Sequence, residues 1–166
     1  MFGKKTYPDT QNAYAWCLQS ARGLFPDRFL APTQHESERI ARFEAICIFA
    51  AMVAWRYEKA GDIHARDAFY QYMFADFDAA LREQGVGDLK VGKEVRKLAG
   101  AFYGRAEGYK PAFDANDPDA LKAAFTRNYV LAPTDDTDSI IGQILATAAR
   151  LEAQSDSQWL AQLTAA

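Results

Sequence analysis

The chain has 166 residues, which is the length of one domain and enough to bury a core without a metal or a disulfide to hold it. Its net charge of −3, with 49% hydrophobic and 25% charged residues, is ordinary for a globular protein and excludes a general affinity for polyanions. The longest apolar run, residues 45–55, is shorter than the roughly 20 residues that a membrane-spanning helix needs.

The first nine residues lack the apolar core of a signal peptide and the Arg/Ser bias of a transit peptide. We therefore expect a cytoplasmic protein, most simply a bacterial one. Along the rest of the chain apolar residues recur with helical spacing, and the alternation typical of strands is absent. The first helix is expected at residues 11–22, where Gly23 and Pro26 end it.

Two long helices are predicted next. The second begins near Thr33, which has capping-box spacing to Glu36, and continues to residue 59. Its apolar run predicts a helix that is buried on most sides. The third spans residues 63–84 and ends at Gly85, because glycine commonly follows the last turn of a helix.

The fourth helix is expected from about residue 90 to residue 113, with Asp88 as its cap. Asp117 and Pro118 have the N-cap and first-turn pattern of a fifth helix, which ends before Pro133. A sixth helix starts at Asp135 or Asp136, and a short tail helix packs on the body through Trp159, Leu160 and Leu163. We therefore predict an all-α fold, a single-domain bundle of about six or seven helices over residues 1–166.

Residues that could carry out chemistry are scarce. His35 and His64 have no second ligand at metal-binding spacing, and the acidic residues 135–138 lack the glycine and distal glutamate of a calcium loop. Cys17 and Cys47 are expected to be buried thiols in a reducing compartment, although a disulfide between them stays open. We predict no catalytic residue, metal or cofactor, and no small-molecule substrate.

The fourth helix carries glycines at a spacing of four, which places Gly100, Gly104 and Gly108 on one face. Each glycine inside a helix costs about 1 kcal/mol against alanine, so three together call for a reason. Glycine lets another helix approach closely. Two interpretations stay open: another helix of this chain fills the groove, or the glycines form a docking surface for a foreign segment. The basic and aromatic residues on or beside this face are Lys93, Arg96, Lys97 and Tyr103.

Charge is unevenly distributed. Residues 88–110 hold six basic and three acidic side chains, whereas residues 114–166 hold eight acidic and three basic ones. A basic segment of this kind suits anionic lipid headgroups, ribosomal RNA or an acidic protein face. On the third helix, Asp78 and Arg82 are four residues apart and are predicted to pair on its surface.

Residues 69–109 contain a run of short motifs: Leu-Arg-Glu at 81–83, Gly-Val-Gly-Asp-Leu at 85–89, Val-Gly-Lys at 91–93 and Phe-Tyr-Gly-Arg at 102–105. In order and spacing this stretch resembles the ubiquinol–cytochrome c chaperone family, whose members assist assembly of the respiratory cytochrome bc1 complex by attending newly made cytochrome b. Arg-Phe-Glu at 42–44 also resembles the family pattern, and no resemblance is evident from residue 132 onward.

The resemblance implies an assembly chaperone whose partner is cytochrome b or another bc1 subunit, with the anionic membrane surface or the ribosome as a further contact. It implies a cytoplasmic protein, peripheral at the inner face of the membrane. The alternative is a ribosome- or RNA-associated module without a membrane client, and a helical enzyme has less support. The candidate partner-binding residues are Asp78, Arg82, Lys93, Arg96, Lys97, Gly100, Tyr103, Gly104, Arg105 and Gly108.

Overall fold

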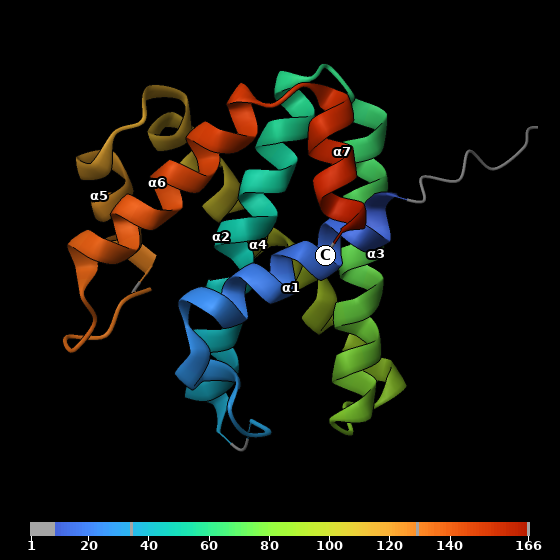
Figure 1. The fold of residues 1–166 in the computed structure, drawn as a ribbon. Coiled ribbons are helices and arrows are strands. Elements are labelled where there is room, and N and C mark those ends of the chain that lie inside the picture. Colours follow the sequence, from blue (N-terminus) through green and yellow to red (C-terminus); the bar gives the residue numbers. More distant parts are fainter. Residues whose placement is uncertain (1–8, 34, 129, 166) are drawn as a thin grey trace, which may run out of the picture.

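The computed structural model describes residues 9–33, 35–128 and 130–165, and these residues form an all-α bundle (Figure 1). No strand occurs among them, so the predicted fold class is confirmed. The elements are α1 (Asp9–Leu24), a 3-10 turn η1 (Pro26–Phe29), α2 (Glu36–Lys59), α3 (Ile63–Glu83), α4 (Asp88–Ala115), α5 (Pro118–Asn128), α6 (Thr137–Ala153) and α7 (Asp156–Thr164).

Helix α2 is the centre of the bundle. Every residue from Glu44 to Tyr57 is buried, because α2 packs against α1, α3, α4 and α6 at once. This confirms the burial predicted from the apolar run. In Figure 1 the first turns of α2 and the far end of α3 extend downward as two separate ends. None of the described helices combines the length and the hydropathy that crossing a membrane requires.

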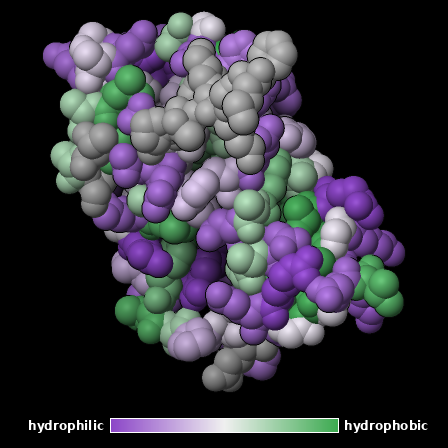
Figure 2. Space-filling model, turned by 90° about the vertical axis from the view of Figure 1, so that its right-hand side faces the viewer, coloured by the Kyte–Doolittle hydropathy of each residue, from purple (hydrophilic) through white to green (hydrophobic). Residues whose placement is uncertain are grey.

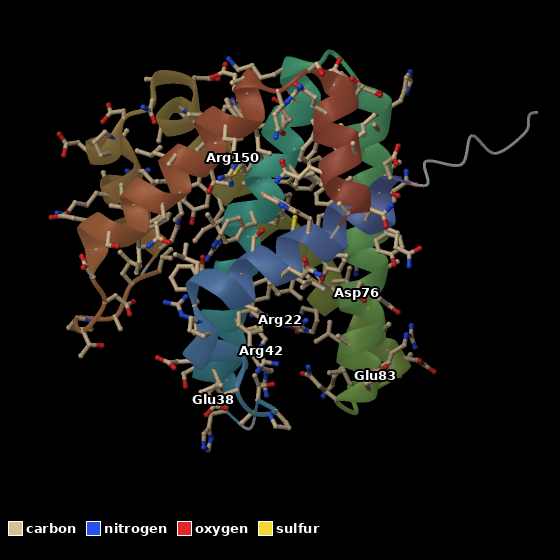
Figure 3. All side chains as sticks on the ribbon, viewed as in Figure 1. Arg22, Glu38, Arg42, Asp76, Glu83 and Arg150 are labelled. Atoms are coloured by element: carbon tan, nitrogen blue, oxygen red, sulfur yellow. The ribbon has the colours of Figure 1, made fainter. Side chains whose placement is uncertain are left out.

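The surface of the bundle is polar over most of the face shown in Figure 2, where apolar residues occur only in small groups between hydrophilic ones. Charged side chains are also prominent on the two downward ends (Figure 3). Arg22, Glu38 and Arg42 lie at the α1–α2 end, whereas Asp76 and Glu83 lie along α3.

Helix α7 is the tail helix expected from the sequence. Its Trp159 and Leu163 are buried, and the Trp159 ring meets the Trp16 ring of α1 edge-on at 6.2 Å. The buried Arg56 of α2 ties the start of α7 to the core: its Nε donates to the carbonyl oxygen of Leu151 at 2.9 Å, and its Nη2 donates to Asp156 at 2.7 Å.

Two predicted helix caps are wrong. The cap of α2 is His35, whose backbone N–H is bonded by Glu38 at 3.1 Å, and not Thr33 with Glu36. Arg42 of α2 also donates to the carbonyl oxygens of Arg28 in η1 and of Ala31, which holds the preceding segment against the first turns of α2.

The cap of α4 is Gly87, whose carbonyl oxygen accepts from the N–H of Val91 at 3.1 Å, so Asp88 is the first helical residue; its carboxylate bonds Arg82 instead of capping the helix. At the other two predicted starts the structure agrees with the sequence. The Asp117 carboxylate accepts from the backbone of α5, and that of Asp136 accepts from Ser139 N–H at 3.1 Å.

Both cysteines are buried free thiols, as expected. Burial raises the pKa of Cys17 and of Cys47 well above the ordinary value, because the thiolate would lose its hydration. The disulfide that the sequence left open is not formed.

Candidate partner-binding face of α4

Helix α4 has one face in the core and one in solvent, as the predicted periodicity requires. Its inner side buries Val91, Phe102 and Tyr109 against α2, α3 and α5. On the opposite side a strip of basic residues and glycines faces outward. We call this strip the outer face of α4; it consists of Lys90, Lys93, Arg96, Lys97, Gly100, Gly104 and Gly108.

The glycines of the outer face are open. A Cβ atom placed on Gly100 or Gly104 would meet no atom within 4 Å, and one on Gly108 would lie at 3.9 Å from Arg127 of α5, an ordinary contact. Within the described residues, therefore, no other helix fills the strip, and the interpretation as an internal groove does not hold. At Gly100 and Gly104 the lost helix propensity is not recovered by packing against any described residue.

The cations of the outer face have no acidic partner. Lys90, Lys93, Arg96 and Lys97 are exposed, and none forms an ion pair with any residue in the described ranges. Further along the same helix, Lys110 does pair, with Glu58 at 2.5 Å. The positive charge of the first half of α4 is thus directed to solvent, where it can act on a partner.

Tyr103 forms an aromatic edge beside the glycines. Its side chain is 45% exposed, and its ring stands edge-on to Tyr70 at 5.4 Å and to Phe74 at 5.7 Å. These contacts fix the ring, and partial burial raises the pKa of Tyr103. A docked segment would therefore meet a rigid aromatic wall along one side of the strip.

Arg105, a predicted partner contact, points inward instead. Its Nε donates to Glu44 of α2 at 2.7 Å, and its Nη2 bonds the other carboxylate oxygen. The Glu44 side chain is 2% exposed, and the guanidinium also lies over the Phe43 ring at 5.4 Å. The hydrogen bond that Arg105 donates to Glu44 raises the pKa of Arg105 above its ordinary value. Arg105 therefore joins α2 to α4, and both partners belong to motifs that the sequence displays.

Asp78 and Arg82 stabilise the corner between α3 and α4. Arg82 Nε donates to Asp78 at 2.6 Å, as the spacing of four predicts, and Nη1 bonds Asp88 across the corner. Gly85 has φ +84°, which only glycine adopts without strain, so the chain can turn there. Leu89 follows with a fully exposed side chain, 100%, which sequence reasoning did not anticipate.

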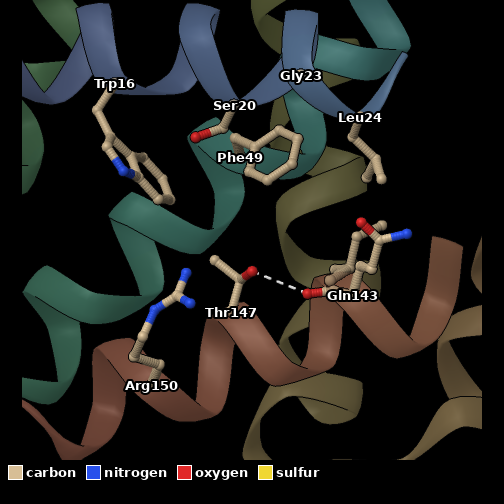
Figure 4. A pocket seen from close by; sticks show the side chains of 9 residues that line it. Trp16, Ser20, Gly23, Leu24, Phe49, Gln143, Thr147 and Arg150 are labelled. Atoms are coloured by element: carbon tan, nitrogen blue, oxygen red, sulfur yellow. Dashed lines mark hydrogen bonds between the residues drawn. The ribbon is translucent and has the colours of Figure 1, made fainter. Parts of the chain in front are cut away.

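Outside α4, the described residues were compared with the requirements of a small-molecule site and of a metal site. A pocket of about 200 Å³ lies between α1, α2 and α6, with Trp16 and Phe49 as its apolar wall and Arg150 at its rim (Figure 4). Small-molecule sites usually have roughly 300–1,000 Å³. No group of three or more His, Cys, Asp or Glu side chains in the described part of the chain is arranged to hold a metal ion.

The bundle and its open, basic helix face define a helical protein suited to contact with another macromolecule. A family model described as ubiquinol–cytochrome C chaperone matches residues 40–164. The chain therefore belongs to the ubiquinol–cytochrome c chaperone family. The match continues through α6 and the whole of α7, so the expected loss of resemblance after residue 132 is wrong.

A solved structure supports the same conclusion. The chain is similar to the crystal structure of the Cbp3 homolog from Brucella abortus, with 31% identity and a TM-score of 0.68. The likeness covers 93% of this chain and 86% of the other. Among curated proteins, no match was found.

Proposed function

We propose that this protein is an assembly chaperone of the cytochrome bc1 complex that holds a segment of newly made cytochrome b against the outer face of α4. The family supports the chaperone role and the link to the complex. The observation that carries the choice of surface is the open space over Gly100 and Gly104 on an exposed helix.

The shape of the glycine strip fits an apolar helix as the client. A strip without side chains lets a second helix approach the backbone of α4 closely and gain van der Waals contact along its length. The Tyr103 ring would cover one flank of that helix. The cations at the N-terminal end of the strip would face the acidic headgroups of the membrane that the client is entering. The chaperone acts by binding alone, so the proposal has no catalytic step and needs no cofactor.

The proposal also implies where in the cell the protein acts. A protein that meets cytochrome b as it is made would be cytoplasmic and peripheral at the inner face of the membrane. Asp78 and Arg82 would contribute by holding the α3–α4 corner in place, and Arg105 by fixing α4 on α2, whereas Lys93, Arg96 and Lys97 would contact the partner directly.

A second candidate function is binding to the ribosome or to RNA without a membrane client. The observation in its favour is the same set of exposed cations without acidic partners. Binding of this kind releases counterions, so its affinity falls steeply with salt. A capture of cytochrome b that survives high salt supports the chaperone and not this alternative.

A photo-crosslinking experiment tests the proposed surface. The photoreactive residue p-benzoylphenylalanine replaces Tyr103 in the protein, and cytochrome b is synthesised in a cell-free system that contains membranes. The matched control has the same residue at Tyr72, a tyrosine of α3 that is 38% exposed and whose ring contacts Tyr14 of α1. We expect a crosslink to cytochrome b from position 103 and none from position 72. Equal crosslinks, or none from position 103, would contradict the proposed surface.

A further inference from the structure

The α3–α4 corner presents an apolar side chain that nothing in the described chain covers. Leu89 is 100% exposed, more than any other large apolar residue that the structure describes; the next is Leu30 at 78%. An exposed leucine forgoes the free energy that burial would supply, but single exposed leucines are common on protein surfaces, so Leu89 is informative only together with its fixed position and the cations around it.

The position of Leu89 is fixed. The residue lies in the first turn of α4, where the N–H of Lys90 donates to the carbonyl oxygen of Gly87 at 2.8 Å. On the other side of the corner, the N–H of Val86 donates to the carbonyl oxygen of Leu81 at 3.0 Å. Arg82 spans the two helices through Asp78 and Asp88. Leu89 is therefore carried on a rigid tip and not on a loose segment.

Cations surround this tip. Lys93 and Arg96 follow Leu89 at four and seven residues, which places all three on one side of α4, and Lys90 and Lys97 lie beside them. The acidic residues near the corner do not pair with these cations. Asp88 is bonded by Arg82, and Glu83 lies on α3. Glu94 lies within one turn of Lys90 and Lys97 but forms no ion pair with either in the described part of the chain. The tip therefore combines one apolar side chain with four cations that have no described acidic partner.

We propose that the α3–α4 corner is a peripheral membrane anchor, in which Leu89 enters the headgroup region of an anionic bilayer while Lys90, Lys93, Arg96 and Lys97 meet lipid phosphates. Apolar residues next to lysine or arginine are the composition of interfacial anchors, because each group finds its preferred depth. Lysines near an anionic surface each strengthen binding about fivefold. Single-stranded RNA would instead favour aromatic residues on which bases stack, and the tip offers a leucine.

The inference rests on the proposed function, which already turns these cations toward acidic headgroups, and deepens it by naming Leu89 as the inserted side chain and lipid phosphates as the ligands. A chaperone that binds its client on another surface would still bind lipid through this corner. A corner that does not bind lipid would leave the proposed client binding at the glycines unaffected. The tests for the two can therefore fail independently.

Leu89→Trp in the full-length protein provides a direct reporter. The three native tryptophans are buried, and the parent protein measured in parallel supplies their background signal. With vesicles of phosphatidylcholine and phosphatidylglycerol, we expect a blue shift of the emission of Trp at position 89 and its quenching by lipids brominated on the acyl chains. With phosphatidylcholine alone we expect neither.

Vesicle co-sedimentation measures the charges. The double variant Lys90→Glu with Lys93→Glu should bind anionic vesicles at least roughly 25-fold more weakly, since each lysine contributes about fivefold. The control is Lys122→Glu with Arg150→Glu, which makes the same change of net charge on α5 and α6 and should keep most of the binding. Circular dichroism confirms that each variant is folded. Equal loss in both variants, an unshifted emission with anionic vesicles, or a response to single-stranded RNA in place of vesicles would overturn the anchor.

Discussion

Replacing Gly104 by alanine adds one methyl group at the middle of the outer face of α4. The new Cβ meets no atom within 4 Å, so the change introduces no overpacking, which typically costs 1–3 kcal/mol. Alanine also forms helix more readily than glycine, by about 1 kcal/mol in a helix interior. The free energy of unfolding should therefore rise by up to about 1 kcal/mol, which is roughly 2–4 °C in Tm for a chain of this size.

The same methyl should weaken the hold on the client, because it stands where a second helix would approach the backbone. Two measurements are needed: thermal unfolding followed by circular dichroism, and the amount of cytochrome b that co-isolates with the protein after cell-free synthesis. Gly142→Ala is the matched control. Gly142 is an exposed helical glycine of α6, and its Cβ would also meet nothing within 4 Å. Both variants should melt at a higher temperature, and only Gly104→Ala should capture less cytochrome b.

Two results would refute this reasoning. A lower melting temperature for Gly104→Ala would mean that the methyl meets a packed neighbour, so the strip would be an internal contact. A raised melting temperature together with undiminished capture of cytochrome b would mean that the client docks on another surface.

Arg105→Ala should lower the free energy of unfolding by about 3–5 kcal/mol, measured in urea, because the buried Glu44 carboxylate loses its partner; adding Glu44→Gln should recover much of the loss. Lys93→Glu with Lys97→Glu should change stability by less than about 1 kcal/mol, and yet weaken binding to anionic vesicles or to cytochrome b; unchanged binding in both assays would rule the role out. Burial raises the pKa of Glu58, but hydrogen bonds from two cations outweigh it and leave the pKa below the ordinary value of 4.5. Its ion pairs therefore stabilise the fold above that value and are lost as pH falls through the lower folded pKa. The melting temperature of Glu58→Gln should then fall less steeply with decreasing pH than that of the parent. An unaltered dependence of the melting temperature on pH would contradict this.

Local features of the fold follow from the order of the residues. The helices of the bundle were predicted to within a few residues, since apolar spacing and glycine stops act over one or two turns. The cap of α2 is an exception that shows the limit of local patterns. Thr33 has the right spacing to Glu36, but His35 and Glu38 have the same spacing, and it is His35 whose backbone N–H donates to Glu38 at the start of the helix.

The family was also readable from the sequence, because its motifs are short runs of defined residue types. Helical spacing also places Gly100, Gly104 and Gly108 on one side of a helix with lysines, because the spacing along the chain sets which residues share a face.

What lies opposite each helix face depends on the packing of the whole bundle. Whether another helix covers Gly104 depends on how α5 and α6 pack, and they leave it open. Arg105 looked like a surface cation until the fold brought it to Glu44, 61 residues away in the chain. Leu89 stands in one of the sequence motifs, but only the fold shows that its side chain points into solvent at the α3–α4 corner. The physical reason is common to all three: burial and pairing depend on residues distant in sequence, and no local pattern encodes that distance.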